Sequence, residues 1–324
     1  MLQRRRFLAA GALAASPWVR AQSGVYPARS IRWIVGYPPG GGSDFVARTI
    51  GNAMTPGLGH PMVIDNRPGA ATILGATALK ASAPDGYTVF SADLGTLVYN
   101  PLLYKKLPYD PIEDFAHIGF TNLYQFLLIC NPAFPARNVR EVVAQAKNAG
   151  SKLFYASPGI GSTHHLTMEM FAQQAGIELE HTPYKGSAPA LQGVMAGEVP
   201  LMVVDVATGL PMIRGGKVRP LALAARSRSA LLPEVPTFAQ SGLPGVETNS
   251  WSVLVAPKGT PAAIVDRLAK ELKTALGQPE TVKKLGEFGV DPLIGTPDEV
   301  VAAIKADTQR WGAVAKRLNI SLEY

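Results

Sequence analysis

The stretch 31-IRWIVGYPPGGGSDFVARTIGNAM-54 decides the fold class of this chain. It opens with a short, β-branched apolar run, 31–36, which predicts a buried strand. A glycine-rich loop follows directly, and then Val46, Ile50 and Met54 recur at the spacing of one helix face. Strand, loop and helix in this order form the unit from which α/β folds are built.

The same alternation continues along the chain. Further apolar runs predict strands at 62–65, 87–92, 126–130, 153–156, 179–183, 201–206, 220–225 and 252–256. Helical patterns lie between or after them, at 139–149, 163–175, 188–196, 210–214, 261–276, 281–288 and 298–318. Strands that alternate with helices indicate mostly parallel sheets with helices on both faces.

The 324 residues are enough for about two ordinary domains. The segment 24–122 holds only three clear strands, too few for a well-covered sheet. We therefore expect the segment 247–324 to return to this first lobe, and 123–246 to form the second lobe. The predicted fold is a two-lobed α/β architecture with a ligand cleft between the lobes, at the carboxyl ends of the strands.

The first 21 residues have the pattern of an export signal. Arg4–Arg6 precede the apolar run 7–15, and small residues up to Ala21 fit cleavage before Gln22. The arginine run also resembles a twin-arginine signal, so that route and the general secretory route both stay open. The apolar run is too short to span a membrane core of ~30 Å. We expect a cleaved, periplasmic protein without stable membrane insertion.

Composition excludes several classes of protein. The formal charge is +7, but four basic residues lie in the predicted signal, which leaves 27 basic and 24 acidic residues, a net +3. That charge is dispersed, with no basic run, so nucleic-acid binding is not expected. The single cysteine, Cys130, permits neither an internal disulfide nor a thiolate zinc cluster.

The loop 37–44 is the first candidate binding site. Its glycines allow close backbone approach, and the helix that follows begins with free N–H groups that favour an anion. It matches neither the P-loop nor the dinucleotide-binding spacing, so no nucleotide is expected. A plain tight turn is the alternative interpretation. The candidate ligand contacts are Tyr37, Pro39, Gly40, Gly41 and Asp44.

A second loop, 157–165, repeats this chemistry after another predicted strand. Two such loops, one from each lobe, could face each other across the cleft and hold a small anion between two helix N-termini. The candidate contacts in this loop are Ser157, Gly159, Gly161, Ser162, Thr163 and His164.

A third loop follows the predicted strand 201–206. Asp205 could accept a ligand amine or hydroxyl, or it could simply cap the next helix. A carboxylate beside an anion site would repel the ligand unless a donor offsets it. Ala207 and Thr208 complete this set of candidates, and Ser91 ends a strand at the equivalent edge of the first lobe.

Catalytic and metal chemistry find little support. Ser162, His164 and Asp205 could be imagined as a triad, but the Gly-x-Ser-x-Gly elbow is missing and His164 follows Ser162 by only two residues. No His-Glu-x-x-His or similar ligand spacing occurs. We therefore expect no enzyme activity, no metal and no cofactor.

A series of short motifs resembles one known family. These are 37-YPPGGGSD-44, 65-DNRPGA-70, 84-PDGY-87, 107-LPYD-110, 159-GIGS-162 with 165-HL-166, 183-PYKG-186 and 256-APKGTP-261. In this order, and behind an export signal, they resemble the Bug-type extracytoplasmic solute receptors of tripartite tricarboxylate transporters. The likeness covers essentially the whole mature chain. One departure is Ala70-Ala71-Thr72, where the family usually continues with glycines.

The resemblance implies a type II-like periplasmic binding protein, acting as a monomer. Such a receptor closes around a small carboxylate solute and delivers it to the membrane permease subunits of its transporter. In the family, loops matching 39–44 and 157–163 hold the carboxylate through backbone amides and hydroxyls, and 205–208 adds discrimination. Two alternatives stay open: a binding protein that presents its solute to a sensor kinase, and an exported hydrolase that uses Ser162.

Overall fold

The computed structural model describes residues 26–148, 152–318 and 321–322. The predicted signal 1–21 and its cleavage site lie outside these residues. The strands are β1 (Ile31–Val35), β2 (Met62–Asn66), β3 (Thr88–Asp93), β4 (Phe115–Cys130), β5 (Leu153–Ser157), β6 (Leu179–Pro183), β7 (Leu201–Asp205), β8 (Arg219–Leu223), β9 (Asn249–Pro257) and β10 (Val290–Pro292).

The helices alternate with these strands over much of the chain. They are α1 (Gly42–Leu58), α2 (Ile73–Lys80), α3 (Asn100–Leu103), α4 (Val139–Asn148), α5 (Thr163–Ala175), α6 (Ser187–Ala196), α7 (Val206–Arg214), α8 (Ala262–Leu276), α9 (Pro279–Glu287) and α10 (Pro297–Leu318). A 3₁₀ turn, η1 (Ala70–Thr72), and a π-helical turn, η2 (Gly95–Tyr99), complete the elements.

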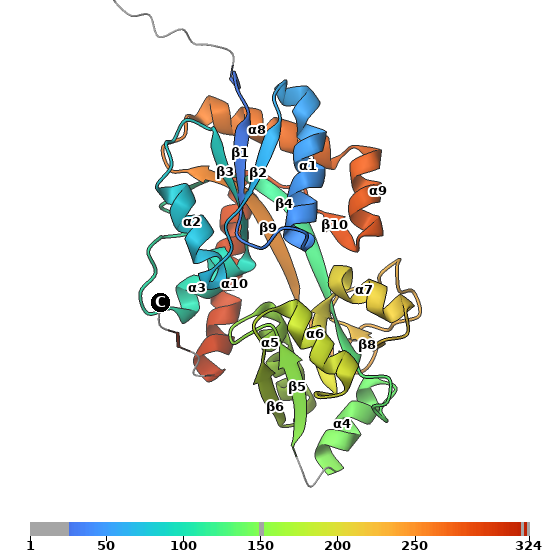
Figure 1. The fold of residues 1–324 in the computed structure, drawn as a ribbon. Coiled ribbons are helices and arrows are strands. Elements are labelled where there is room, and N and C mark those ends of the chain that lie inside the picture. The colour runs from blue at the N-terminus through green and yellow to red at the C-terminus, as the bar shows by residue number, and fades with distance from the viewer. Residues whose placement is uncertain (1–25, 149–151, 319–320, 323–324) are drawn as a thin grey trace, which may run out of the picture.

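The two lobes share one long strand, β4. Its first part, 115–125, pairs with β9 on one side, and β10 joins its other edge at 122–124. Its second part, 126–130, pairs with β7 and β8. Figure 1 shows β4 running out of the lobe that contains β1–β3 and into the lobe that contains β5–β7. The two-lobed α/β class is therefore confirmed.

The expectation of mostly parallel sheets needs a correction. In the first lobe β2, β1 and β3 run parallel, but β9, β4 and β10 pair antiparallel. In the second lobe β6, β5 and β7 run parallel, whereas β4 pairs antiparallel with both β7 and β8. Both sheets are mixed because the strands that carry the chain between the lobes enter each sheet from its opposite end.

The stretch quoted first behaves as its pattern predicts. Trp33 of β1 is fully buried, and Val46, Ile50 and Met54 form the buried face of α1. These side chains join one apolar cluster with residues of α8, so α1 and α8 cover the same face of the first sheet. Burying a large apolar side chain contributes roughly 1.5–3 kcal/mol, so this cluster firmly seats the start of α1.

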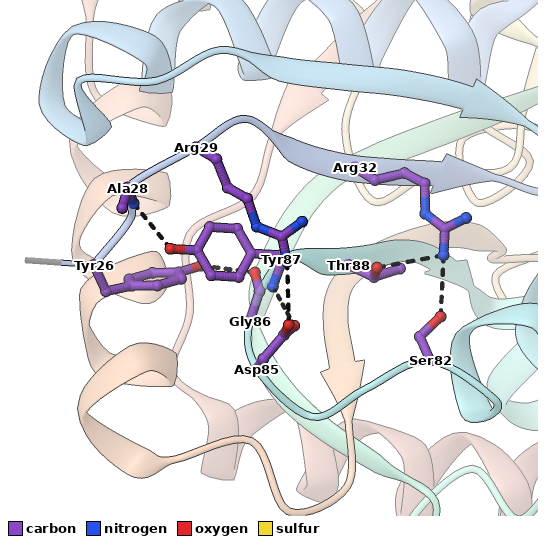
Figure 2. Close-up of polar contacts among 9 residues, drawn as sticks. All are labelled: Tyr26, Ala28, Arg29, Arg32, Ser82, Asp85, Gly86, Tyr87 and Thr88. Carbon is purple, nitrogen blue, oxygen red and sulfur yellow. Dashed lines mark hydrogen bonds and ion pairs between the residues drawn. The ribbon is translucent and has the colours of Figure 1, made fainter. Parts of the chain in front are cut away.

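The turn 84–87 anchors the beginning of the described chain. Tyr26 Oη donates to the Gly86 carbonyl at 2.7 Å, and the Ala28 N–H donates to Tyr87 Oη at 2.9 Å (Figure 2). Arg29 lies over the Tyr87 ring, with its central carbon 4.2 Å from the ring centroid. These contacts lie at the start of β1 and β3, the opposite end from the loops predicted to bind ligand. The motif 84–87 therefore stabilises the fold and does not contribute to the predicted ligand site.

The loop after β2 keeps a glycine-like conformation without glycine. Ala70, Ala71 and Thr72 have φ of 45°, 49° and 72°, all in the left-handed region. Two side-chain contacts hold the loop: Asn100 Nδ2 donates to the Ala71 carbonyl at 2.8 Å, and the hydroxyls of Thr72 and Thr96 lie 2.6 Å apart. Each such residue costs roughly 1–2 kcal/mol, so this departure from the family pattern stores strain.

Replacing Ala71 with glycine should relieve part of that strain. We expect Ala71→Gly to raise the free energy of unfolding by about 1 kcal/mol. Glycine adopts the left-handed conformation without strain, and this relief outweighs the extra conformational entropy of glycine in the unfolded chain. Urea denaturation of the purified protein measures this. Ala78→Gly, within α2, is the matched control and should destabilise by about 1 kcal/mol. If both variants lost the same free energy of unfolding, the left-handed conformation of Ala71 would not be strained.

Candidate ligand-binding site

Three helices begin where β4 passes from one sheet to the other. A Cβ built on Gly42, at the start of α1, would lie 3.4 Å from Tyr124 Oη on β4. The His164 ring, at the start of α5, meets the Phe126 ring edge-on with centroids 5.1 Å apart. His164 Nε2 also lies 3.8 Å from Oδ2 of Asp205, which caps α7. We call this place, around residues 122–126, the crossing region.

Pro39, Gly40 and Gly41, in the loop before α1, are exposed. Asp44 is only 5% exposed, and its carboxylate accepts hydrogen bonds from the Gly40 N–H at 3.0 Å and from Arg48 at 2.9 and 3.0 Å. The bond to Arg48, aided by the Gly40 amide, holds the pKa of Asp44 below its usual range despite burial. Asp44 thus shapes the loop and occupies one of its amides.

Tyr37 and Ser91 are held by the first lobe. The Tyr37 hydroxyl donates to Asp93, which also accepts from the N–H and the hydroxyl of Thr96, both at 2.8 Å. Although Tyr37 is 39% exposed as a whole, desolvation of its hydroxyl, followed by the charge of Asp93, raises the pKa of Tyr37 well above its ordinary value, so the phenol remains a donor. Ser91 accepts a hydrogen bond from Trp33 Nε1 at 2.7 Å, and this bond ties its hydroxyl to the core.

The hydroxyls of the second loop also serve its own shape. Ser157 is fully buried, and its Oγ lies 2.6 Å from His181 Nε2. Ser162 is the N-cap of α5, where its Oγ accepts from the His165 N–H at 3.3 Å and donates to the Gly159 carbonyl at 2.8 Å. The Ser162 hydroxyl is thus engaged in both directions within the loop.

The amides of Gly159 and Gly161 also form hydrogen bonds within this loop and the start of α5. The Gly159 N–H donates to Ser157 Oγ at 3.1 Å, and the Gly161 N–H donates to His165 Nδ1 at 3.1 Å. Gly161 has a φ of +79°, and a Cβ built there would lie 2.5 Å from Leu103 Cδ1 in α3 of the other lobe. Gly161 is therefore required for close approach of the lobes.

Free amides remain at the starts of α1 and α5. Within the part of the chain that the structure describes, the N–H groups of 41–44 and of 163–164 have no hydrogen-bond partner. Such groups, with the dipole of the helix behind them, favour a negative charge. The donors available to an anion are thus the amides at the two helix N-termini, including those of Gly41 and Gly42, whereas the amides of Gly40, Gly159 and Gly161 are already used within the loops.

Asp205 caps α7, which is one of the two roles that the sequence suggested for it. Its Oδ1 accepts from the Thr208 N–H at 2.8 Å. Burial disfavours the charge on Asp205, but His164 and the Thr208 amide outweigh burial and lower its pKa, so it is ionised. Ala207 is buried, and its N lies 3.1 Å from the position that a Cβ on Gly289 would take. The lobes therefore touch here too, between α7 and the turn before β10.

Sequence reasoning missed several buried donors around the crossing region. Asn122 is 1% exposed and its Nδ2 has no partner among the described residues; the same holds for Tyr124 Oη. Tyr99, from η2, is 3% exposed with an unpartnered Oη. Burial raises the pKa of Tyr99, and the neighbouring Thr163 side chain opposes this shift only in part. Unpaired buried donors are rare in native proteins, so they mark a place for a ligand. The signal in the sequence was a polar interruption at the predicted lobe boundary.

A hollow of about 420 Å³ lies beside this region, between α1 and α9. Its charged lining groups are paired: Arg48 with Asp44, and Lys284 with Glu280 at 2.8 Å. All its lining residues come from the first lobe, so this hollow is not shared between the lobes.

The described residues contain no cluster of His, Cys, Asp and Glu that could hold a metal ion. In the same part of the chain, none of the helices combines the length and the apolar character needed to cross a bilayer.

Two α/β lobes joined by a shared strand, with helix N-termini around the crossing, define the class of periplasmic binding proteins. The chain belongs to the tripartite tricarboxylate transporter family of receptors within that class. The model of the "Tripartite tricarboxylate transporter family receptor" matches residues 46–320. The resemblance to Bug-type receptors is thereby confirmed.

Relatives and solved structures agree with this family. The chain is 35% identical over 311 residues to a UPF0065 protein of Pseudomonas sp. strain P51, covering 95% of this chain and 92% of that one. It is 33% identical over 299 residues to Protein BugT of Bordetella pertussis, covering 92% of each.

Three solved structures are similar over nearly their full length. Periplasmic binding protein BugD gives a TM-score of 0.82 at 32% identity, covering 92% of this chain and 100% of that one. Rpa4515 of R. palustris, solved with adipate, gives 0.85 at 33%, with the same coverage. MatC of Rhodopseudomonas palustris, with bound malate, gives 0.79 at 31%, covering 89% and 99%. The family is one of solute receptors, which supports a non-enzymatic role.

Proposed function

We propose that this protein binds a small carboxylate between its two lobes and delivers it to the membrane permease subunits of a tripartite tricarboxylate transporter. The observation that carries the proposal is the set of free helix N-termini around the crossing region. The amides of 41–44 come from one lobe and those of 163–164 from the other. A carboxylate bound by both replaces its lost hydration with protein donors.

Binding of this kind couples the ligand to the position of the lobes. We infer that 24–122 with 247–324 form one lobe and 123–246 the other, and that β4 and β9 carry the chain between them. A ligand that touched one lobe alone would not change their relative position, whereas one held by both favours closure. The lobes already lie close to each other at Gly161 and Gly289 in this structure.

The chemistry of the relatives supports a carboxylate. Rpa4515 was solved with adipate and MatC with malate, and both are similar to this chain over their whole length. We infer export to the periplasm with cleavage near Ala21, function as a monomer, and no metal or nucleotide. Ser162 is occupied as a helix cap, so the hydrolase alternative finds no favourable observation.

A thermal-shift screen tests the proposed function. We expect one or more small mono- or dicarboxylates to raise the melting temperature of the mature protein, because a ligand bound to the native state stabilises it in proportion to its saturation. At about one hundred times the dissociation constant the gain is about 2.7 kcal/mol. The matched controls are the corresponding neutral amides and simple sugars. A shift with neutral sugars alone would contradict the anion site.

A further inference from the structure

His164 is a buried base without a hydrogen-bond partner. Its side chain is 14% exposed, and among the described residues neither Nδ1 nor Nε2 makes a hydrogen bond. The ring stands edge-on to Phe126. A buried imidazole normally satisfies at least one nitrogen, so both nitrogens of His164 are available to something that the protein itself does not supply.

The neighbouring Asp205 creates a charge problem at this site. Its carboxylate lies 3.8 Å from His164 Nε2 and is ionised. A second carboxylate brought to the same place would be repelled, because two like charges in a dry site interact strongly. A positive charge between them would turn this repulsion into two attractions. Since His164 already touches Asp205, it is the basic group placed to provide that charge.

Other groups of the crossing region fit this role. From β4, Tyr124 and Asn122 offer unpartnered donors. The negative charges of Asp205 and, more weakly, Asp93 reach Tyr124. On α5, the next residue, His165, carries no charge because burial lowers its pKa to about 3. The free groups are thus donors, whereas both aspartates already have hydrogen-bond partners.

We propose that His164 is a specificity-determining residue that takes up a proton when a dicarboxylate binds, and then bridges Asp205 and the ligand's second carboxylate. The proton comes from solvent, and no covalent bond changes. This inference rests on the proposed function, in which the first carboxylate is held by the amides of α1 and α5. It adds that the second acidic group of the ligand is recognised by charge, and that binding is linked to pH.

Calorimetry measures this linkage directly. Succinate, glutarate and adipate are titrated, each beside its monomethyl ester, at about pH 7 in two buffers of different ionisation enthalpy. We expect net proton uptake for at least one diacid, tighter binding of that diacid than of its ester by about tenfold or more, and weaker diacid binding as pH rises. The ester should bind without proton uptake.

The variant His164→Gln keeps a hydrogen-bonding side chain but cannot carry the charge. We expect it to abolish the proton uptake and to weaken the diacid about tenfold, while the ester changes by less than about threefold. His60→Gln, in the loop between α1 and β2, is the matched control and should resemble the wild type. A merely structural role for His164 would weaken acid and ester equally and leave proton uptake unchanged.

The outcomes separate this inference from the proposed function. Esters that bind as tightly as their diacids, with no proton uptake, would overturn the role of His164 while the carboxylate receptor stands. Failure of every diacid and every ester to bind, together with a negative carboxylate screen, would overturn both.

Discussion

Gly161→Ala should weaken carboxylate binding by about tenfold or more, whereas Gly176→Ala should leave the affinity nearly unchanged. Gly161 has a φ of +79°, and an added Cβ would lie 2.5 Å from Leu103 Cδ1 in the opposite lobe. The variant thus bears the cost of a left-handed alanine, roughly 1–2 kcal/mol, and the buried Leu103 side chain or the loop must also move to make room for the new methyl group. Both effects act on the loop that positions the free amides of 163–164.

Gly176 provides the matched control for this prediction. It ends the same helix, has a φ of +61°, and an added Cβ would meet nothing within 4 Å. Gly176→Ala therefore bears the conformational cost without the collision. Calorimetric titration with the best ligand of the carboxylate screen gives the affinities, and thermal unfolding gives the stabilities. If the two variants lost the same stability and the same affinity, contact between the lobes at Gly161 would not matter for binding.

Acidification from about pH 6.5 to about pH 4 should destabilise the protein by about 5 kcal/mol, to which each of two stacked histidines contributes roughly half. The rings of His165 and His181 lie 4.1 Å apart between centroids, with an interplanar angle of 13°. Burial, then the charge of His181, lowers the pKa of His165 to about 3, and burial lowers that of His181 to about 4. Both rings are therefore neutral in the folded protein.

The sign follows from comparing folded and unfolded states. An unfolded histidine has a pKa near ~6.5, so between that value and the lowered ones the unfolded chain binds more protons. The free energy of unfolding therefore has its full value above about pH 6.5 and decreases as pH falls toward 4. His181→Phe keeps a stacked ring without a titrating group and should flatten the profile. Urea unfolding across the pH range measures it, and identical slopes for variant and wild type would contradict this origin.

Much of the fold could be predicted because its signals are local. The apolar run 31–36 and the helix face Val46, Ile50 and Met54 specify a strand and a helix without reference to distant residues. The sixteen-residue β4 could not be predicted in full. Its second part is a continuous apolar run, but its first part is interrupted by Gly119 and Asn122, and it becomes a strand only by pairing with β9. The antiparallel partners depend in the same way on long-range contacts.

The candidate site could be predicted at the level of loops but not of atoms. Glycine-rich turns between strand and helix are visible in the sequence. Which amides stay free depends on side chains that fold back, such as Asp44 onto Gly40 and His165 onto Gly161. The unpartnered Asn122 and Tyr124 were missed because the polar interruption at the lobe boundary does not show what these side chains will face once β4 has formed.

Amide NMR titration of the labelled mature protein shows whether one carboxylate contacts both helix starts. We expect a carboxylate that stabilises the protein to shift the amide resonances of 41–44 and of 163–164 together, with one common dissociation constant. Shifts confined to one of these helix starts, or to residues away from both, would show that the ligand is not held between the lobes.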